Sequence, residues 1–405
     1  MTAYVLYTIL IVTSVIIIFK LILMIVSNTS SGFWLTQPVF HIHNISYWIK
    51  PIGIVNKSHP PITKFVNFSN TKIIKIMPSF SNDFKDQPPT IKQLCAFIRD
   101  NYLIHDLVTY HPSCDDILAY LECNSHPSFF ITYDEKDSYN ITPRLHPQIS
   151  GLMTSRILNV SIKLKSSFSD FSVYYVDNLC VKPSSRNLGI TPQLIQTMYY
   201  HVSREIPSVN VYMFKREMKL NNIIPLTYYN TLCFDTQNIK SIYPITTHYL
   251  IEISETNVSI FIDFIKYNKS RFDCIILPDE SSLVNLIIKK KITIYLYIVD
   301  NVVILSIVYR NTTLIYSNIR TIECISIVST LNYSSDNGLL VKLFCESLAK
   351  QGNTGILIID DVSDSKHLIK KLSESFNIIF KIPNAFYLFN YICYSYDKYK
   401  TLLIY

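Results

Sequence analysis

The order of predicted helices and strands repeats once along the chain, and this repetition constrains the fold more than any other feature. Apolar periodicity predicts helices at residues 93–100, 114–121, 191–205, 257–267, 281–288, 338–350 and 366–375. Strands are predicted at residues 128–132, 152–164, 171–181, 292–299, 302–309, 321–331, 355–360, 385–391 and 400–405. The turn residues Asp300 and Asn301 should join two of these strands in a hairpin. Both halves contain two helices, antiparallel strands and a further helix, which predicts an α/β fold built from a duplicated unit.

The composition argues against several classes of protein. Charged residues make up 17% of the chain, below the roughly 25% that is typical of soluble domains, and the net charge is +7. Lysine runs such as 289–291 are expected at solvated helix ends, so no nucleic-acid partner is predicted. The nine cysteines are scattered without a Cys-x-x-Cys pair, which disfavours a disulfide framework or a zinc site. His41 and His43 lack a third ligand at metal spacing and are expected to be loop residues.

An apolar run near the N-terminus predicts a membrane anchor. Residues 4–26 are almost entirely apolar, and at about 1.5 Å per residue they span a hydrocarbon core of about 30 Å. The one charged residue, Lys20, lies near one end, from which its amine can reach the interface. A cleaved signal peptide is the alternative, but the run is long and its start lacks a basic segment. We therefore expect a single-pass membrane protein. Neither flank of the run carries a cluster of Lys or Arg that would set its orientation, and the remaining chain is expected on the cytosolic side.

The most specific local pattern joins a predicted strand to a predicted helix. Asn-Leu-Cys-Val at 178–181 ends the strand, and Arg-Asn-Leu-Gly-Ile-Thr at 186–191 opens the helix. A helix N-terminus offers unpaired N–H groups and a positive dipole end to phosphate oxygens, and small residues let the backbone approach them. Glycine is scarce, with seven in the chain, so Gly189 favours a phosphate site over an ordinary strand–helix connection.

Several stretches of sequence resemble one family of enzymes. Phe-Trp-Leu-Thr-Gln-Pro-Val at 33–39 is similar to a Phe-Trp-x-Thr-Gln-Pro-Val signature near the start of the N-myristoyltransferases (glycylpeptide N-tetradecanoyltransferases). Residues 178–192 resemble the Asn-Phe-Leu-Cys-Val strand and CoA loop of that family, and the pyrophosphate loop of the wider GNAT superfamily. Phe-Tyr-Leu-Phe-Asn-Tyr at 386–391 looks like the family's Tyr-Tyr-Leu-Tyr-Asn-Trp stretch. Tyr102 and Tyr110 also lie where the family has an Asn-Tyr and a Phe-Asp-Tyr-Ser stretch.

The resemblance covers residues 32–405 and implies how the chain is divided. It implies an α/β fold with two GNAT-like lobes in a pseudo-twofold arrangement, here preceded by one transmembrane helix. We expect the anchor at 1–27 and an irregular, proline-broken arm that carries the Phe-Trp signature at 28–90. An acyl-CoA-binding lobe would follow at 91–235, and a peptide-binding lobe at 236–405.

The resemblance also implies an activity, the transfer of myristate from myristoyl-CoA to the amine of an N-terminal glycine. Myristoyl-CoA would be a co-substrate and proteins or peptides that begin with glycine the acceptors, with no prosthetic group and no metal. The residues implied to bind the co-substrate are Phe33, Trp34, Leu179, Cys180, Val181, Arg186, Asn187, Leu188, Gly189, Ile190, Thr191 and Pro192. The residues implied to bind the acceptor are Tyr102, Tyr110, Asp177 and Tyr212.

This chemistry needs a base and a site for an oxyanion. An N-terminal glycine is an ammonium of pKa about 7.7 to 8.0, which must lose a proton before its nitrogen attacks a thioester. In the family the base is the terminal α-carboxylate, which here would be that of Tyr405. Only the position of that carboxylate should matter, so the type of side chain at 405 is expected to be immaterial. The family's oxyanion donors would be the backbone N–H groups of Asn178 and Leu179.

Some positions depart from the family, mainly on the acceptor side. Asp177 stands where the family has an asparagine that helps to hold the glycine amine. Tyr-Met-Phe-Lys at 212–215 replaces a Tyr-Thr-Ala-Gly stretch. Asp177 and Met213 favour one alternative, a catalytically silent membrane protein that keeps the fold for binding or structure. The other alternative is a GNAT-type acyltransferase that uses a different acyl-CoA or a different amine acceptor.

Overall fold

The computed structural model describes most of the chain after residue 29. The described ranges are 30–78, 89–103, 108–135, 148–165, 167–239, 250–331, 337–352 and 355–405, together with eleven residues between 4 and 18. Those eleven are helical, and side chains such as Tyr4 and Ile11 are exposed. Most of the run expected to be an anchor lies outside the described residues. Among the described residues, no helix is both long enough and apolar enough to cross a bilayer.

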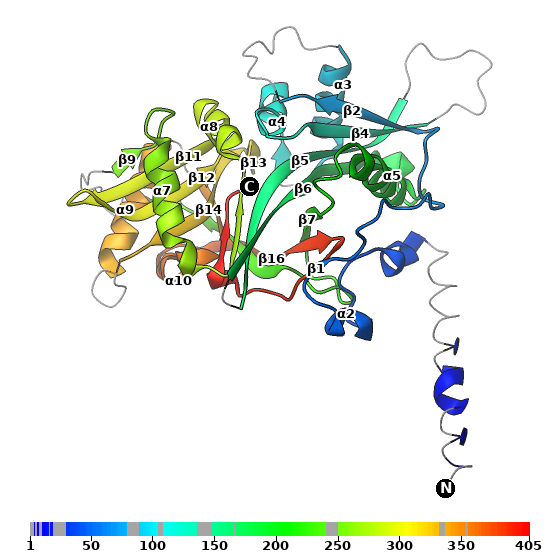
Figure 1. Cartoon of the computed structure of the whole chain (residues 1–405). Helices are drawn as coiled ribbons and strands as arrows, with labels where there is room; N and C mark the ends of the chain where they lie inside the picture. The colour runs from blue at the N-terminus through cyan, green and yellow to red at the C-terminus, as the bar shows by residue number, and fades with distance from the viewer. Residues whose placement is uncertain are drawn as a thin grey trace.

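A mixed sheet of 16 strands runs through both halves of the chain (Figure 1). Its strands are β2 (Thr71–Ile76), β3 (Val108–Tyr110), β4 (Ser128–Glu135), β5 (Gln148–Leu164), β6 (Ser167–Val181), β7 (Tyr212–Glu217), β8 (Thr227–Asp235), β9 (Leu250–Glu252), β10 (Cys274–Leu277), β11 (Ile292–Val299), β12 (Val302–Arg310), β13 (Leu314–Tyr316), β14 (Ile319–Ser329), β15 (Ile356–Asp360), β16 (Ile378–Phe389) and β18 (Thr401–Leu403). A separate pair joins β1 (Gly53–Ile54) to β17 (Tyr391–Ile392).

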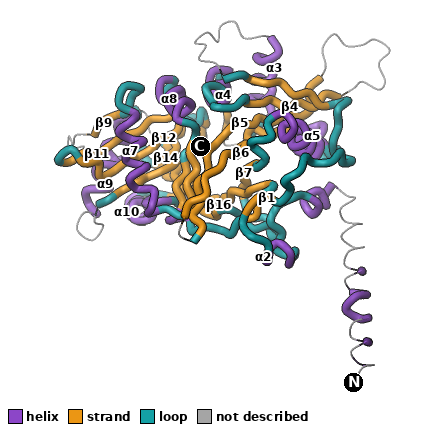
Figure 2. Tube along the Cα trace, in the orientation of Figure 1, coloured by secondary structure: helices purple, strands orange, loops and turns teal. Residues whose placement is uncertain are grey.

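Helices cover this sheet in both halves, as Figure 2 shows. The α-helices of the described residues after residue 29 are α2 (Ile45–Ile49), which lies at the edge beside β1, and α3 (Pro89–Asn101), α4 (Cys114–Leu121), α5 (Ile190–Glu205), α7 (Val258–Asn268), α8 (Glu280–Ile288), α9 (Asn337–Lys350) and α10 (Lys366–Ser375). Short 3-10 helices are η1 (Ser30–Thr36), η3 (Pro183–Ser185), η4 (Lys269–Arg271), η5 (Ser363–Ser365) and η6 (Lys398–Lys400). α5 packs on one apolar cluster, and α9 and α10 pack on another at the opposite end of the molecule.

The main path of the sheet shows the predicted duplication. β4, β5 and β6 are antiparallel neighbours, and β7 follows α5 to pair with β6 in parallel. β11, β12 and β14 are likewise antiparallel neighbours, and β15 follows α9 to pair with β14 in parallel. β16 then lies between β7 and β8, and β8 pairs with β15. The two halves therefore share one sheet and exchange their last strands.

Local sequence explains where several elements begin and turn. Ser113 caps α4 through its side chain, and the Asp116 carboxylate accepts from the Ser113 N–H, which completes a capping box. Asp300 and Asn301 adopt φ angles of 48° and 63° and close the β11–β12 turn. The helix predicted at 114–121 and the hairpin predicted around Asp300 are thus confirmed.

The segment 28–90 differs from the irregular arm that was expected. Its residues 71–76 form β2, which pairs with β4, because its prolines flank this apolar run without interrupting it. Phe33, Val39 and Phe40 are buried, each at most 2% exposed, so this segment contributes to the core. Strands β7 and β8 were also not predicted, and both lie in the middle of the sheet.

Candidate active site

The strands β6 and β7 separate near the middle of the sheet. They pair in parallel over residues 174–176 and 212–214, although β6 runs on to Val181 and β7 to Glu217. Just beyond the paired part, β6 contains a β-bulge. Leu152 pairs with Cys180 and Thr154 with Asp177, so β6 has one residue more than β5 between the two pairs. Such a bulge turns backbone groups of β6 away from the ladder, toward the gap between the two strands.

Asn178 lies in this bulge and adopts a positive φ of 50°. The Thr154 hydroxyl donates to the Asp177 carbonyl at 3.1 Å, and Asn178 Nδ2 donates to Thr154 Oγ1 at 3.0 Å. The backbone N–H of Asn178, predicted to be an oxyanion donor, donates to Asp177 Oδ1 at 2.8 Å. The Asp177 carboxylate thus occupies this donor.

The predicted phosphate loop lies at the end of β6 and opens α5. Gly189 adopts a φ of 73° and precedes Ile190 without a side-chain cap on the helix. Gly151 of β5 packs closely against this helix start, because a Cβ there would lie 2.6 Å from Ile190 Cγ2. Arg186 and Leu188 are exposed, with Arg186 Nε 3.4 Å from the Val181 carbonyl. The loop therefore presents a glycine, a cation and uncapped helix N–H groups together.

Aromatic side chains of η1 pack against Phe65 and against Phe214 of β7. Trp34 stacks on Phe214 of β7 at a centroid distance of 5.1 Å, and Phe33 contacts Phe65 edge to face at 5.1 Å. Leu179 and Val181 are half-buried and pack against the same apolar cluster as Trp34. Cys180 and Pro192 are buried, and burial raises the pKa of the Cys180 thiol to about 12, so it is no ready nucleophile. These residues form an apolar surface between the loop 186–191 and β7.

Tyr405 lies on the other side of the gap and is almost completely buried. Its ring meets those of Phe386 and Tyr175 edge to face, at centroid distances of 5.1 and 5.8 Å. Lys215 Nζ donates to the Tyr405 hydroxyl at 2.7 Å, and Arg310 Nη1 donates to its main-chain oxygen at 3.4 Å. The side chain at 405, expected to be immaterial, is thus held on several sides.

Charged groups from distant parts of the chain gather around Tyr405. Arg310 pairs with the buried Glu323, with Nη2 and Oε2 2.6 Å apart. Burial alone would lower the pKa of Lys215, but Tyr405, Asp360 and Glu323 outweigh it and raise that pKa. Burial raises the pKa of Asp360, whose carboxylate accepts from the Thr231 hydroxyl at 2.5 Å. Lys215 and Arg310 are partly exposed, so the cluster has an open side.

Most residues predicted to bind the acceptor are near this cluster. Tyr102 and Tyr110 contact each other with ring centroids 5.6 Å apart. Burial raises the pKa of both phenols, and Asp177 raises it further. Tyr212 does not join them, because its ring packs against Tyr174 and Tyr199 on the other face of β7.

The sequence interpretation did not find four charged residues of this cluster. They are Arg156, Arg310, Glu323 and Asp360, which come from β5, β12, β14 and β15. Their spacing along the sequence carries no pattern, and they meet only when these strands are assembled. A charged residue inside an otherwise apolar strand, such as Arg156, was the one local signal.

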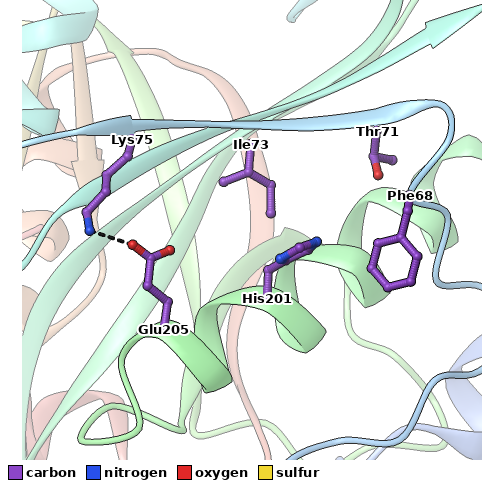
Figure 3. Close-up of a pocket in the computed structure, with 6 residues that line it drawn as sticks. All are labelled: Phe68, Thr71, Ile73, Lys75, His201 and Glu205. Atoms are coloured by element: carbon purple, nitrogen blue, oxygen red, sulfur yellow. Dashed lines mark hydrogen bonds and ion pairs between the residues drawn. The ribbon is translucent and has the colours of Figure 1, made fainter.

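A shallow groove of about 450 Å³ lies between β2 and α5, away from Tyr405. Figure 3 shows its lining residues, which are Phe68, Thr71, Ile73, Lys75, His201 and Glu205. Lys75 and Glu205 form an ion pair across it. The described residues hold no group of three or more His, Cys, Asp or Glu side chains placed to bind a metal. None of the residues predicted to bind acyl-CoA or acceptor lines this groove.

The fold resembles that of known proteins. No protein-family model and no curated protein sequence matches the chain. Crystal structures of Saccharomyces cerevisiae N-myristoyltransferase with bound myristoyl-CoA do match, with a TM-score of 0.68. One is 13% identical over 90% of this chain and 93% of its own, and another is 14% identical over 90% and 89%. A third, with myristoyl-CoA and inhibitors, has 15% identity, a TM-score of 0.68 and 90% coverage of each chain.

These matches define the fold of the chain as that of the N-myristoyltransferases. The resemblance inferred from the sequence is confirmed at the level of the fold, over nine-tenths of the chain. At 13–15% identity, a shared activity does not follow from the shared fold. Function has to be argued from the residues around the gap between β6 and β7.

Proposed function

We propose that this protein is an acyl-CoA-dependent N-acyltransferase that transfers myristate to the amine of an N-terminal glycine. The observation that supports it most is the arrangement on either side of one gap. An uncapped helix start with Gly189 and Arg186 lies on one side, and the buried main chain of Tyr405 lies on the other. Both are built on the N-myristoyltransferase fold, whose yeast example is known with myristoyl-CoA bound.

The phosphates of the co-substrate would lie on the loop 186–191, next to the first turn of α5. Their charge is favoured there by the Arg186 guanidinium and by the positive end of the helix dipole. The acyl arm would pass along Phe33, Trp34 and the half-buried Leu179 to reach the gap. Each of these groups binds the substrate without taking part in proton transfer.

The reaction would then proceed by nucleophilic attack on the thioester. The ammonium of the acceptor gives a proton to the α-carboxylate of Tyr405, and the neutral nitrogen bonds to the thioester carbon. The N–H groups of Asn178 and Leu179 would hold the resulting oxyanion. The carbon–sulfur bond breaks, CoA leaves as a thiolate, and the second proton of the nitrogen passes to that thiolate. The products are an amide and free CoA.

For this step the N–H of Asn178 must leave the Asp177 carboxylate, to which it donates at 2.8 Å. An arriving ammonium competes for the same carboxylate, so acceptor binding would free the oxyanion donor. Without acceptor, the Asn178 N–H would stay on Asp177 and the thioester would not be activated. This coupling would protect the co-substrate from hydrolysis.

A catalytically silent binding protein is the second candidate. The Asp177–Asn178 contact and the Lys215 side chain beside Tyr405 favour it, because the first fills an oxyanion donor and the second adds a cation where an ammonium should bind. Under this alternative the protein binds acyl-CoA and transfers nothing.

Transfer from myristoyl-CoA to a Gly-initiated peptide tests both candidates, with CoA thiol release and peptide mass as readouts. The same assay with shorter acyl-CoAs tests the acyl preference. A chain extended beyond Tyr405 by a few residues should lose transfer about 10²–10⁴-fold, because the carboxylate is displaced, yet bind myristoyl-CoA normally. Normal transfer by the extended chain would contradict the carboxylate mechanism. Binding without any transfer by the unaltered chain would favour the silent protein.

We also propose that residues 1–27 anchor the protein in a membrane, with the catalytic part on the cytosolic side. The apolar sequence at 4–26 supports this. The full-length chain should stay with membranes in alkaline carbonate, whereas a chain that starts at Ser30 should be released and still bind acyl-CoA. Release of the full-length chain would disprove the anchor.

A further inference from the structure

Arg156 is a buried guanidinium with two unpartnered nitrogens. It lies on β5 opposite Tyr175 of β6, and it is 1% exposed. Among the described residues, neither Nε nor Nη1 of Arg156 has a hydrogen-bond partner. Buried donors are normally satisfied, and leaving one unsatisfied costs about 1–3 kcal/mol, or more when the group is charged. Two unsatisfied donors on one buried cation point to an oxygen-bearing ligand.

Aromatic rings hold this guanidinium in place beside the candidate active site. Its central carbon is 5.1 Å from the ring centroid of Tyr120 on α4 and 5.4 Å from that of Tyr175. The Tyr120 hydroxyl is also buried without a partner among the described residues, so a third donor lies close by. Tyr175 contacts Tyr405 in turn. A single ring thus separates Arg156 from the residue proposed to supply the base.

The charges around Arg156 fit an acceptor that combines an amine with an oxygen. Burial lowers the pKa of Arg156, and the Asp177 carboxylate is the strongest of the charges that offset this effect. Asp177 is also the position expected to hold the acceptor amine. An amine held near Asp177 and Tyr405, with an oxygen directed to Arg156, is the pattern of an α-aminoacyl group.

We propose that Arg156, assisted by Tyr120, binds the carbonyl or carboxylate oxygen of an α-aminoacyl acceptor whose amine faces Tyr405. Arg156 is thus a specificity-determining residue, which selects acceptors with an oxygen on the carbon next to the amine-bearing carbon. Simple alkylamines are rejected, because they leave the buried donors unpaired. This inference rests on the proposed transfer to glycine, and the acceptor can be a free amino acid or the first residue of a peptide.

Acceptor binding can be measured without turnover. The full chain in detergent, saturated with a non-cleavable thioether analogue of myristoyl-CoA, is titrated calorimetrically with three acceptors. These are a Gly-initiated peptide, the same peptide with its first peptide bond replaced by a trans-alkene, and free glycine. The unaltered chain should bind the alkene peptide at least about tenfold more weakly than the natural one, the loss expected for a hydrogen bond to a charged group. Whichever of glycine and the natural peptide binds more tightly identifies the source of the acceptor.

Variants separate a binding role of Arg156 from a structural one. Arg156→Met should bind the two peptides equally, and Arg156→Lys should retain part of the discrimination. Arg99→Met, on the exposed surface of α3, is the matched control and should behave as the unaltered chain. Tyr120→Phe should weaken binding of the natural peptide and leave binding of the alkene peptide unchanged. This variant tests the inference if Arg156→Met fails to fold.

Two results would overturn the inference. One is an Arg156→Met variant that still binds the natural peptide more tightly than the alkene peptide. A fall in both affinities with this preference intact would show that Arg156 has only a structural role. The other is an unaltered chain that binds none of the acceptors or both peptides equally. Selective binding without any transfer in the turnover assay would instead refute the proposed reaction and leave the role of Arg156 standing.

Discussion

Lys215 Nζ lies 2.7 Å from the hydroxyl of Tyr405, so an amine from the middle of the sheet holds the side chain of the last residue. The two residues are 190 positions apart in the sequence. Burial raises the pKa of the Tyr405 phenol more than Lys215 and Arg310 lower it. The phenol therefore stays neutral, and its oxygen accepts the hydrogen bond from Lys215. The terminal residue is thereby fixed by its side chain as well as by its main chain.

Tyr405→Phe should destabilise the fold by about 1 kcal/mol, because it removes the oxygen to which Lys215 donates. Lys215→Met should cost a similar amount, and the double variant should cost no more than either change alone. Urea unfolding of the four proteins measures the coupling. Strict additivity of the two losses would show that the hydrogen bond contributes nothing.

Gly151→Ala should weaken acyl-CoA binding, because its Cβ would lie 2.6 Å from Ile190 and push the start of α5 out of place. Gly338→Ala is the matched control, since a Cβ there meets nothing within 4 Å and alanine favours the helix α9. Calorimetry with myristoyl-CoA and thermal unfolding report the two effects separately. Equal affinities for the two variants would show that the helix start is not used by the co-substrate.

Stability should fall in acid partly through Asp116. Burial would raise the pKa of this carboxyl, but hydrogen bonds from Lys291 and Ser113 outweigh it and lower the pKa. A carboxyl with a lowered pKa in the folded state adds stability above its ordinary value near 3.8, and this stability is lost as the pH falls through the lowered pKa. Asp116→Asn should therefore destabilise the protein at pH 7 and much less at pH 2.5, as measured by urea unfolding. Asp115→Asn, which changes the neighbouring carboxyl on the same helical turn, is the matched control.

Cys95 and Cys114 should form a disulfide under mild oxidation. Their Sγ atoms are 2.9 Å apart, at the contact of α3 with α4. Diamide would accept two electrons and two protons from the two thiols and become the hydrazine, leaving one sulfur–sulfur bond. Thiol counting should show the loss of two thiols, and Cys95→Ser should abolish it. Tyr102 and Tyr110 belong to the loop of sequence that this bond would close, so the oxidised protein should also bind acceptor peptide with an altered affinity.

The sequence predicted best those elements whose signals are local. α4 and the β11–β12 hairpin follow from Ser113 and from Asp300 with Asn301, residues that act within one turn of the chain. The residues 178–191 were recognised for the same reason, as a strand end, a glycine and a helix start in one stretch.

The elements that were missed depend on contacts between distant strands. β7 and β8 contain the polar residues Lys215 and Asn230, which are typical of exposed segments. Their sequences therefore do not indicate that both strands lie in the middle of the sheet. Arg156 was overlooked because a charged residue in a strand normally faces solvent, whereas here it lies between two tyrosine rings. Arg156, Arg310, Glu323 and Asp360 could therefore not be predicted, since these four charged residues are brought together only by the completed sheet.

The exchange of last strands between the two halves has a consequence for synthesis on the ribosome. β7 and β8 are made early, yet the strand that joins them, β16 (Ile378–Phe389), follows much later in the sequence. Until then both keep bare edges, and the N-terminal half cannot close its sheet alone. We expect the nascent chain to need protection by a chaperone until β16 has emerged. Any shortened product that lacks β16 leaves one edge of β7 and one edge of β8 without a partner strand, and so carries two sites for aggregation in the middle of the sheet.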